Sequence, residues 1–291
     1  MKFSGQTFVV TGGGRGLGKA IAVHLATSGA SIATCARSMR ELDVLRREME
    51  GVGTTVLTVP IDVTDIEAMH HFAQTVVTEL GPAVGLVNNA AVLGPIGRID
   101  AIDLDEWRRT IEIDLFGVAN ACAAFTPQMI ARGGGSIVNI SGGGVGGANI
   151  ATHVSAYFAA KVGVVALSEA LARELEAARI HVHALAPGPL ETSFLRAILD
   201  VDAGGSDETL RSTAVEMHAD VPTEPLSLDA GFTELLDLLL SDDAAGLTGK
   251  LLSARWDAVD ILRSQTEAFS TSSVFNLRRI DDVLFREIEE D

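Results

Sequence analysis

The chain has 291 residues, of which 47% are hydrophobic and 21% charged, a balance typical of folded globular proteins rather than disordered ones. Its formal net charge of −17 would repel a polyanionic backbone, so nucleic acid is not expected as a partner. Apolar runs are much shorter than the roughly 20 residues of a membrane span, and the chain starts on a strand pattern, so neither a membrane nor a secretory signal is expected.

Short runs rich in β-branched residues alternate with longer stretches of helical period. Strands are expected at Thr7–Thr11, Ser31–Cys35, Thr55–Val59, Val84–Val87, Ser136–Ile140, Ile180–Leu185 and Lys250–Ser253. Helices are expected at Leu17–Ser28, Arg40–Glu50, Ile66–Leu80, Leu104–Ala131, Ala156–Ala178 and Leu228–Leu240. Because the strands lack polar alternation, both faces of the sheet should be covered. The pattern predicts an α/β fold with a doubly wound parallel sheet, a Rossmann fold.

One Rossmann-type domain is expected over residues 1–255, followed by a C-terminal extension at 256–291. Residues 194–227 break the strand–helix rhythm just after a strand end, where ligands of such sheets bind, so they are predicted to form a substrate lid. The extension alternates apolar and charged residues, which fits a packing or subunit-contact arm as well as a loose acidic tail. Cys35 and Cys122 lack metal-ligand spacing, so no metal is expected, and they indicate buried thiols in a reducing cytoplasm.

A glycine-rich turn, Thr-Gly-Gly-Gly-Arg-Gly-Leu-Gly over residues 11–18, directly follows the first strand and opens the first helix. Glycines let the backbone approach a pyrophosphate, and the helix N-terminus adds free N–H groups and a positive dipole end. The turn therefore predicts a nucleotide site. The expected contact residues are Gly12, Gly14, Arg15, Gly16, Leu17 and Gly18.

The spacing of this turn resembles the TGxxxGxG motif of the short-chain dehydrogenase/reductase family. Three further motifs of that family follow in order: Asn88-Asn89-Ala90, YxxxK at Tyr157 and Lys161, and PGxxxT at Pro187-Gly188 and Thr192. The resemblance extends over roughly the first 250 residues. The resemblance implies that Asp62 and Val63 contact the adenine, that Asn89 and Ala90 line the cofactor, and that Pro187, Gly188 and Thr192 hold the nicotinamide end. It also implies a small-molecule substrate and a homodimer or homotetramer built on the helices at 104–131 and 156–178.

The end of the second predicted strand indicates which nicotinamide cofactor is used. An acidic residue there would accept hydrogen bonds from the ribose 2′-hydroxyl of NAD. This chain instead has Cys35-Ala36-Arg37-Ser38, and Arg15 can approach the same ribose from the glycine turn. Planar guanidinium groups suit a phosphate, so Arg15 and Arg37 favour NADP over NAD.

The chain has one tyrosine, Tyr157, and Lys161 lies one helical turn further on. A phenol with an ordinary pKa near 10 is a poor base at neutral pH unless a nearby cation favours the phenolate. In the family that this chain resembles, the tyrosine gives or takes the hydroxyl proton while hydride passes to or from nicotinamide, and the lysine also holds the ribose. Tyr157 and Lys161 are therefore the expected centre of the chemistry.

Two positions depart from the family pattern. Gly142 stands where the family has its substrate-orienting serine, so Ser141, or failing it Ser155, is expected to supply the hydroxyl, with His153 in the same loop as a weaker candidate donor. Asp114 stands where the family has an asparagine, and an aspartate can accept the same hydrogen bonds while adding a negative charge near Lys161.

Three functions remain open at this point. The first is an NADP-dependent oxidoreductase acting on CH–OH donors. The second is a non-redox enzyme such as a dehydratase, epimerase or cyclase that keeps the nucleotide site, and the third is a catalytically silent nucleotide-binding protein. The Tyr157–Lys161 pair and PGxxxT favour the first, whereas Gly142 and Asp114 favour the other two.

Overall fold

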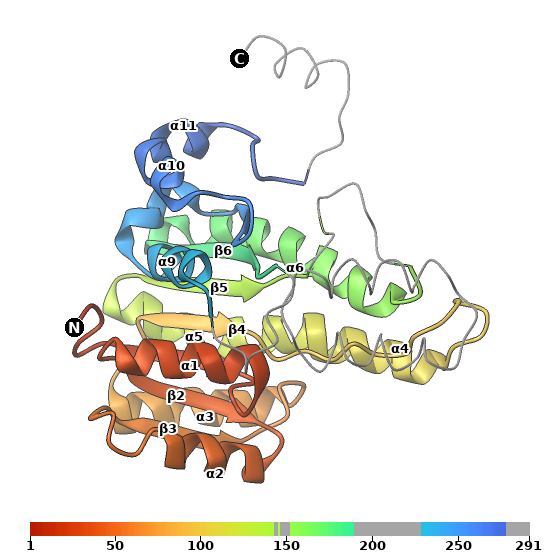
Figure 1. The fold of residues 1–291 in the computed structure, drawn as a ribbon, viewed down its shortest axis with the longest axis horizontal. Helices are drawn as coiled ribbons and strands as arrows, with labels where there is room; N and C mark the ends of the chain where they lie inside the picture. The colour runs from red at the N-terminus through yellow and green to blue at the C-terminus, as the bar shows by residue number, and fades with distance from the viewer. Residues whose placement is uncertain (143–144, 146–151, 189–227, 278–291) are drawn as a thin grey trace.

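The structure is a computed structural model that describes residues 1–142, 145, 152–188 and 228–277. Within these ranges all seven predicted strands form one parallel sheet (Figure 1). They are β1 (Thr7–Thr11), β2 (Ser31–Ala36), β3 (Val56–Pro60), β4 (Gly85–Asn88), β5 (Gly135–Ile140), β6 (Ile180–Ala186) and β7 (Leu251–Ser253). The strand order is β3-β2-β1-β4-β5-β6-β7, which confirms the predicted doubly wound Rossmann fold.

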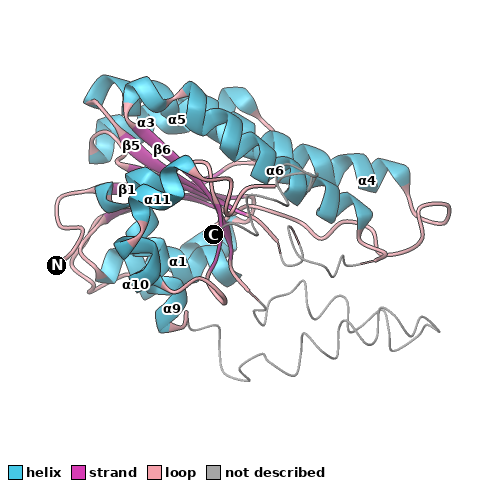
Figure 2. Ribbon diagram, turned by 90° about the horizontal axis from the view of Figure 1, so that it is seen from above, coloured by secondary structure: helices cyan, strands magenta, loops and turns pink. Residues whose placement is uncertain are grey.

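Helices cover both faces of the sheet, as the continuously apolar strands require (Figure 2). One face carries α1 (Gly16–Thr27), α2 (Met39–Glu48) and α9 (Ala230–Leu239), and the other carries α3 (Ile66–Leu80), α5 (Gly117–Arg132) and α6 (Ser155–Glu174). Two hydrophobic clusters fill the space on either side, centred on Phe8 and Ile21 in one and on Phe72 and Phe125 in the other. The sheet is thus buried between two helical layers.

The long helix predicted at 104–131 has a break in its regular pattern. It consists of α4 (Leu104–Ile111), a five-residue π-helical segment η1 (Glu112–Phe116) and then α5. The backbone stays right-handed helical through both junctions, so the axis continues while the hydrogen-bond pattern widens. Such π segments are frequent at functional sites. This one contains Asp114.

Helix α6 is, by length and composition, the described helix that could cross a membrane. Its inner face, however, packs into the protein core through Ala156, Ala160, Val164, Val165 and Ala172. A short 3-10 turn, η2 (Glu176–Ala178), follows it and leads into β6. We therefore describe α6 as a core helix of the fold.

The described part of the C-terminal extension packs on the domain. After the 3-10 turn η3 (Asp242–Leu247) and β7, it forms α10 (Val259–Ser264) and α11 (Thr266–Thr271). Val259 and Leu262 are buried in the same cluster as the α9 leucines. The Leu251 N–H donates to the Phe275 carbonyl at 2.7 Å, so the chain also runs beside the sheet edge. Residues 278–291, like the predicted lid at 194–227, lie outside the described residues.

Candidate active site

The strand order reverses between β1 and β4, because the chain winds outward through β2 and β3 on one side and through β5, β6 and β7 on the other. In an open parallel sheet this reversal leaves a crevice outside the carboxyl ends of the two central strands. The glycine-rich turn follows β1, and the Asn88–Ala91 motif begins at the end of β4. Two of the predicted motifs therefore border this crevice.

The glycines after β1 are packed too closely for larger residues at two points. A Cβ atom at Gly12 would lie 2.8 Å from the Ala90 Cα atom, and one at Gly18 would overlap the Asn89 side-chain amide. Gly16 is different, because a Cβ atom there would meet no atom within 4 Å. The turn is therefore tight against β4 and open at Gly16.

Helix α1 begins at this open point. Arg15 occupies its N-cap position, and no side chain of the described residues caps the helix. Leu17 is buried and anchors the first turn in the core. Four other helices do have capping side chains, namely Ser38, Asp65, Asp103 and Asp229. Because uncapped N–H groups at a helix N-terminus bind phosphate oxygens, the residues present fit the pyrophosphate of a dinucleotide.

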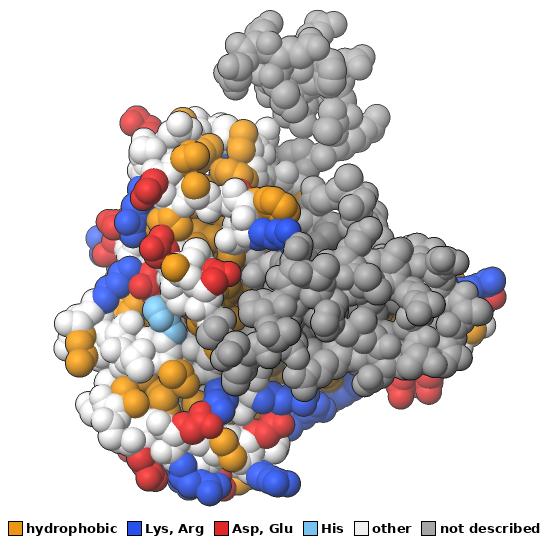
Figure 3. All heavy atoms as spheres, in the orientation of Figure 1, with side chains coloured by type: hydrophobic (Ala, Val, Ile, Leu, Met, Phe, Trp, Pro, Cys, Tyr) orange, Lys and Arg blue, Asp and Glu red, His pale blue; other side chains and the backbone are white. Residues whose placement is uncertain are grey.

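Both predicted arginines are exposed, Arg15 in the glycine-rich turn and Arg37 after β2. Arg37 is exposed directly after the strand, and the Arg15 Nε atom lies 3.7 Å from the Glu41 Oε1 atom. Gly14 packs on the same glutamate, since a Cβ atom there would lie 3.0 Å from the Glu41 Cβ atom. Figure 3 shows basic and acidic side chains interspersed on this face, over α1 and α2. Glu41 of α2 thus places a carboxylate beside Arg15, which the sequence alone did not reveal.

Asp62 and Val63 follow β3. The Asp62 carboxylate accepts hydrogen bonds from the Thr64 N–H at 3.0 Å and from the Thr64 hydroxyl at 2.8 Å, and it pairs with the Arg109 guanidinium. Burial alone would raise the pKa of Asp62, but the Thr64 bonds and the charges of Arg109 and Arg37 lower it overall. Val63 is buried. Asp62 is therefore an ionised acceptor just beyond the carboxyl end of β3.

Asn88 and Asn89 tie β4 to its neighbours in the sheet. The Asn89 and Ala90 N–H groups donate to the Thr11 hydroxyl at 3.0 and 3.1 Å, and the Asn89 side chain donates to the Thr11 carbonyl at 3.0 Å. The Asn88 side-chain amide donates to the side-chain Oδ1 atom of Asn139 at 2.8 Å. These bonds fix the carboxyl ends of β1, β4 and β5 relative to one another.

The same network reaches α6 through residues that sequence reasoning missed. The Asn139 amide donates to the Ser168 hydroxyl at 2.9 Å, and that hydroxyl donates to the Val164 carbonyl at 2.7 Å. Asn139 and Ser168 are both buried. Neither is marked by a motif of its own, and the only available signal was a polar residue within an apolar strand or helix face. The network positions α6, which carries Tyr157 and Lys161.

Tyr157 and Lys161 lie one turn apart near the start of α6, and the structure brings them together. The Lys161 Nζ atom lies 5.6 Å from the centre of the Tyr157 ring and donates to the Ile140 carbonyl at 2.9 Å. Burial lowers the pKa of Lys161, and the charge of Asp114 partly opposes that change. Burial and the charge of Asp114 raise the pKa of Tyr157. The protein alone therefore holds Tyr157 as a neutral phenol.

Asp114 reaches this cluster from the π segment and is fully buried. Its Oδ1 atom accepts the Val92 N–H at 2.8 Å, while Oδ2 has no hydrogen-bond partner among the described residues. Burial raises the pKa of the Asp114 carboxyl from 3.8 to about 6, although the charge of Lys161 and the Val92 N–H oppose the rise. A titratable carboxyl therefore lies beside the tyrosine and lysine.

Gly142 lies against the phenol. A Cβ atom there would be 3.0 Å from the Tyr157 oxygen and 3.2 Å from the Lys161 Cγ atom. The preceding residue, Ser141, is 1% exposed, and its N–H donates to the Leu185 carbonyl at 2.8 Å. The Ser141 hydroxyl has no hydrogen-bond partner among the described residues. A buried hydroxyl that lacks a protein partner thus lies one residue away from the position beside Tyr157.

The two other candidate donors have different surroundings. Ser155 is exposed, and its hydroxyl accepts the Trp107 indole N–H at 3.1 Å. His153 has φ +64°, and its Nδ1 atom lies 3.1 Å from the Thr152 hydroxyl oxygen. Both side chains are already engaged with neighbours at the outer end of α6.

Pro187 and Gly188 follow β6, so the first part of the PGxxxT motif lies at the same end of the sheet. Gly188 has φ +79°, a conformation that glycine adopts readily, and this turns the chain directly after the strand. Thr192 lies outside the described residues.

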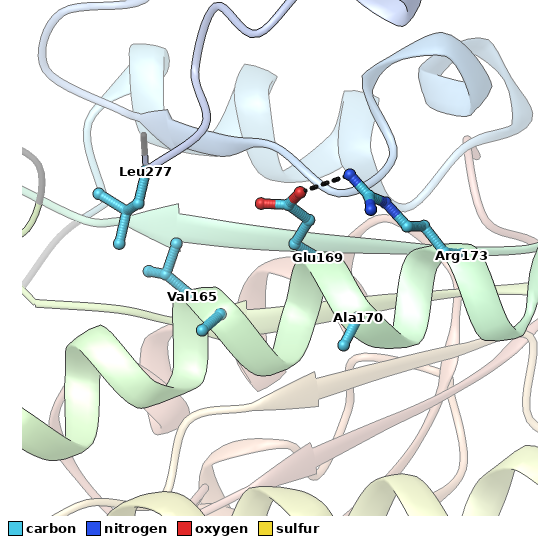
Figure 4. Close-up of a pocket in the computed structure, with 6 residues that line it drawn as sticks. Val165, Glu169, Ala170, Arg173 and Leu277 are labelled. Atoms are coloured by element: carbon cyan, nitrogen blue, oxygen red, sulfur yellow. Dashed lines mark hydrogen bonds and ion pairs between the residues drawn. The ribbon is translucent and has the colours of Figure 1, made fainter. Parts of the chain in front are cut away.

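A separate hollow of about 290 Å³ lies farther along α6 (Figure 4). Val165, Ala166, Ala170 and Leu277 line it, together with the ion pair in which Arg173 Nη2 lies 2.8 Å from Glu169 Oε1. It shares no residue with the Tyr157 cluster, so the two are distinct features of the same helix. Elsewhere in the described ranges no group of three or more His, Cys, Asp or Glu residues could hold a metal ion.

Comparison with known proteins identifies the family. The family model described as short chain dehydrogenase matches residues 6–202. The chain is 34% identical to cis-4-hydroxycyclohexanecarboxylate dehydrogenase of Sinomonas cyclohexanicum, over 86% of this chain and 95% of that protein. It is also 34% identical to glycine betaine reductase ATRR of Emericella nidulans, over 69% of this chain but only 16% of that longer protein.

Solved structures agree with this match. The fold resembles the crystal structure of NAD⁺-bound xylitol dehydrogenase with a TM-score of 0.77 and 27% identity, covering 87% of this chain and 98% of that one. The chain belongs to the short-chain dehydrogenase/reductase family, as the motifs predict. Members of this family are oxidoreductases that bind a nicotinamide cofactor and act on small molecules.

Proposed function

We propose that the chain transfers hydride between NADP(H) and a carbonyl or secondary alcohol of a small molecule, with Tyr157 as the acid and base. The observation that carries this proposal is the cluster of the half-buried Tyr157 with the buried Lys161 and Asp114, beside Gly142 at the carboxyl end of β5. This end of the sheet is also where the glycine turn and Pro187–Gly188 lie. A nucleotide held by the turn and a proton donor on α6 would then meet over one crevice.

The chain's own residues divide the task of binding. The uncapped N-terminus of α1 and the open backbone at Gly16 would hold the pyrophosphate, and Asp62 would accept a hydrogen bond from the adenine amino group. Asn89 and Ala90 would line the crevice, and Pro187, Gly188 and Thr192 would hold the nicotinamide end. When bound, the nicotinamide supplies or accepts the hydride.

Proton transfer falls to Tyr157. For carbonyl reduction the phenol donates its proton to the carbonyl oxygen as that oxygen gains electrons, and solvent then returns a proton to the phenolate. Lys161 stabilises the phenolate that forms, because its ammonium group is fixed nearby by the Ile140 carbonyl. Alcohol oxidation runs the same steps in reverse.

Ser141 is proposed to orient the substrate oxygen in place of the absent serine. Its hydroxyl is buried and has no partner among the described residues, whereas the Ser155 hydroxyl already accepts the Trp107 N–H. A buried hydroxyl that lacks a hydrogen bond is costly unless a ligand satisfies it. The free hydroxyl therefore supports Ser141 over Ser155.

NADP is proposed over NAD, since the residue after β2 is Arg37 and no carboxylate occupies the position that would bind the ribose 2′-hydroxyl. Arg15 adds a second guanidinium. Glu41 opposes this preference in part, because its carboxylate would repel a 2′-phosphate while it holds Arg15. The net charge of the three side chains is still positive.

A non-redox or silent role remains the second candidate, and Gly142 and Asp114 favour it. Without a serine beside the phenol and with a carboxylate in the cluster, the same pocket could move a proton without hydride transfer. We further propose a cytoplasmic location, which the two buried free cysteines support. A homodimer or homotetramer through the α4–α5 and α6 helices is supported by Phe116 and Ile130, which are 57% and 50% exposed there.

The test is an absorbance assay with NADPH or NADP⁺ and a panel of ketones, aldehydes and secondary alcohols. The panel should include hydroxylated ring carboxylates, because one relative is named for such a substrate. Turnover with any member supports the oxidoreductase. If nucleotide binds by calorimetry and no member of a broad panel is oxidised or reduced, the second candidate replaces it.

A further inference from the structure

The cluster contains a buried charge that the steps above do not use. Asp114 is fully buried in the π segment, and only one of its two carboxylate oxygens has a hydrogen-bond partner among the described residues. No ion pair within 4.0 Å joins Asp114 to Lys161 in the described part of the chain. The Lys161 ammonium instead donates to the Ile140 carbonyl. The carboxylate is thus held near the lysine and the tyrosine without being neutralised by a direct contact.

Few groups of the described residues face Asp114. Helix α6 packs against the π segment and carries Lys161 and Tyr157, and the charge of Asp114 raises the pKa of both. The chain after β4 contributes the Val92 N–H. Helix α4 ends with Arg108 and Arg109, and α5 begins with uncharged residues.

Those two arginines are engaged elsewhere. Arg108 pairs with Asp105 at 2.6 Å, and Arg109 pairs with Asp62 and with Glu112. Both guanidinium groups are substantially exposed, so solvent screens them. Among the described residues, the charge that acts on Asp114 is therefore that of Lys161.

We propose that Asp114 is a positioning residue whose negative charge disfavours the Tyr157 phenolate, so that the protonated phenol, the form that carbonyl reduction requires, persists to higher pH. This rests on the proposed function. In that direction the carbonyl C=O becomes H–C–O–H: the carbon takes the hydride from NADPH, which is oxidised to NADP⁺, and the oxygen takes the Tyr157 proton. The phenolate left behind regains its proton from water.

The physical reason is a balance of two buried charges. The Lys161 ammonium favours the phenolate, and the Asp114 carboxylate disfavours it. In the protein without cofactor, burial and Asp114 prevail and raise the pKa of Tyr157. Replacing the carboxylate by a neutral amide of the same shape leaves Lys161 unopposed, so the phenol should ionise at lower pH.

Because the chain has one tyrosine, the ultraviolet difference signal of phenolate reports Tyr157 alone. We would titrate the cofactor-free protein with alkali and compare wild type with Asp114→Asn, following the fold by circular dichroism. Asp105→Asn is the matched control, because it removes the same charge from a side chain that is 88% exposed. Tyr157→Phe gives the baseline.

The expected result is phenolate formation in Asp114→Asn at a pH lower by about one unit or more than in wild type and in Asp105→Asn. The proposal is overturned if the phenolate forms at the same pH in all three proteins, or if it forms only when they unfold in alkali. Should Asp114→Asn not fold, Asp114→Ser supplies a second neutral variant with the same expected shift.

A kinetic arm separates this inference from the proposed function. The rates of reduction and oxidation are measured against pH with any substrate that the wild type turns over. Compared with wild type, Asp114→Asn should lose reductase activity at a lower pH and gain oxidase activity at a lower pH. Identical pH–rate profiles of the two proteins in both directions would contradict the role of Asp114. The alkaline titration needs no substrate, so its shift stands or fails independently of whether hydride transfer is observed.

Discussion

Replacing Asp114 by asparagine should stabilise the folded protein at neutral and alkaline pH. Burial raises the pKa of the carboxyl from 3.8 to about 6. At about 1.4 kcal/mol per unit, keeping Asp114 ionised costs the folded state on the order of 3 kcal/mol relative to a neutral group. An asparagine of the same shape avoids this cost and can still accept the Val92 N–H.

The sign of the pH dependence follows from the direction of the shift. The folded-state pKa lies above the unfolded value, so the folded state binds the proton more tightly. The contribution of Asp114 to stability is therefore fully present below about pH 4 and is lost as pH rises through about 6. The advantage of Asp114→Asn should be about 3 kcal/mol at pH 8 and should shrink toward zero at pH 4.

Urea unfolding at a fixed protein concentration, repeated from pH 4 to 8 as far as each protein stays folded, measures this difference. Asp105→Asn again serves as the control and should show no comparable trend. A variant less stable than wild type at pH 8 would refute the reasoning, because it would mean that attraction between Asp114 and Lys161 outweighs the cost of burying the carboxylate.

Three further predictions concern the cofactor preference and the residues beside the phenol. NADPH should bind at least about ten-fold more tightly than NADH, a difference in binding free energy of about 1.4 kcal/mol. Arg37→Asp should reduce this difference in affinity, measured by calorimetry. Equal affinities of the wild type for the two cofactors would contradict the NADP assignment. Ser141→Ala should lower turnover by roughly 10²-fold while Ser155→Ala changes it little, and the opposite ranking would move the role to Ser155. Gly142→Ala should slow turnover because its Cβ atom would lie 3.0 Å from the Tyr157 oxygen and crowd it. If a hydroxyl at this position assists, Gly142→Ser should retain more activity than Gly142→Ala. A Gly142→Ala variant as active as wild type would show that the contact is tolerated.

The sheet was largely predictable from the sequence because its strands are buried on both faces. Each predicted strand overlaps an observed one, and their ends differ by at most one residue. Helix α3 begins and ends where the periodicity predicts, with Asp65 as its cap. The helices α10 and α11 were not predicted, because such short polar helices depend on packing of Val259 and Leu262 rather than on a pattern of their own.

The site was predictable where it rests on motifs and unpredictable where it rests on burial. The spacing of Tyr157 and Lys161 predicted that they share one helix face, and the resemblance placed Asp114 near Lys161, but neither showed that Asp114 is fully buried in a π segment. Apolar periodicity does not distinguish a π segment from a continuous helix. The Asn139–Ser168 hydrogen bond likewise joins residues far apart in the chain, and nothing local in the sequence reports it.

The most direct test of the whole account is the Tyr157→Phe variant, assayed with any substrate that the wild type turns over. The change removes one oxygen and keeps the ring, so the fold and the nucleotide affinity should survive. Turnover should decrease by a factor approaching about 10⁴, the upper end of what general acid–base assistance contributes. The chain has no second tyrosine that could replace Tyr157. Lys161→Ala should differ by weakening NADPH binding as well as turnover. Undiminished turnover in Tyr157→Phe, with NADPH still bound, would contradict the proposed chemistry and leave only a nucleotide-binding protein of this family.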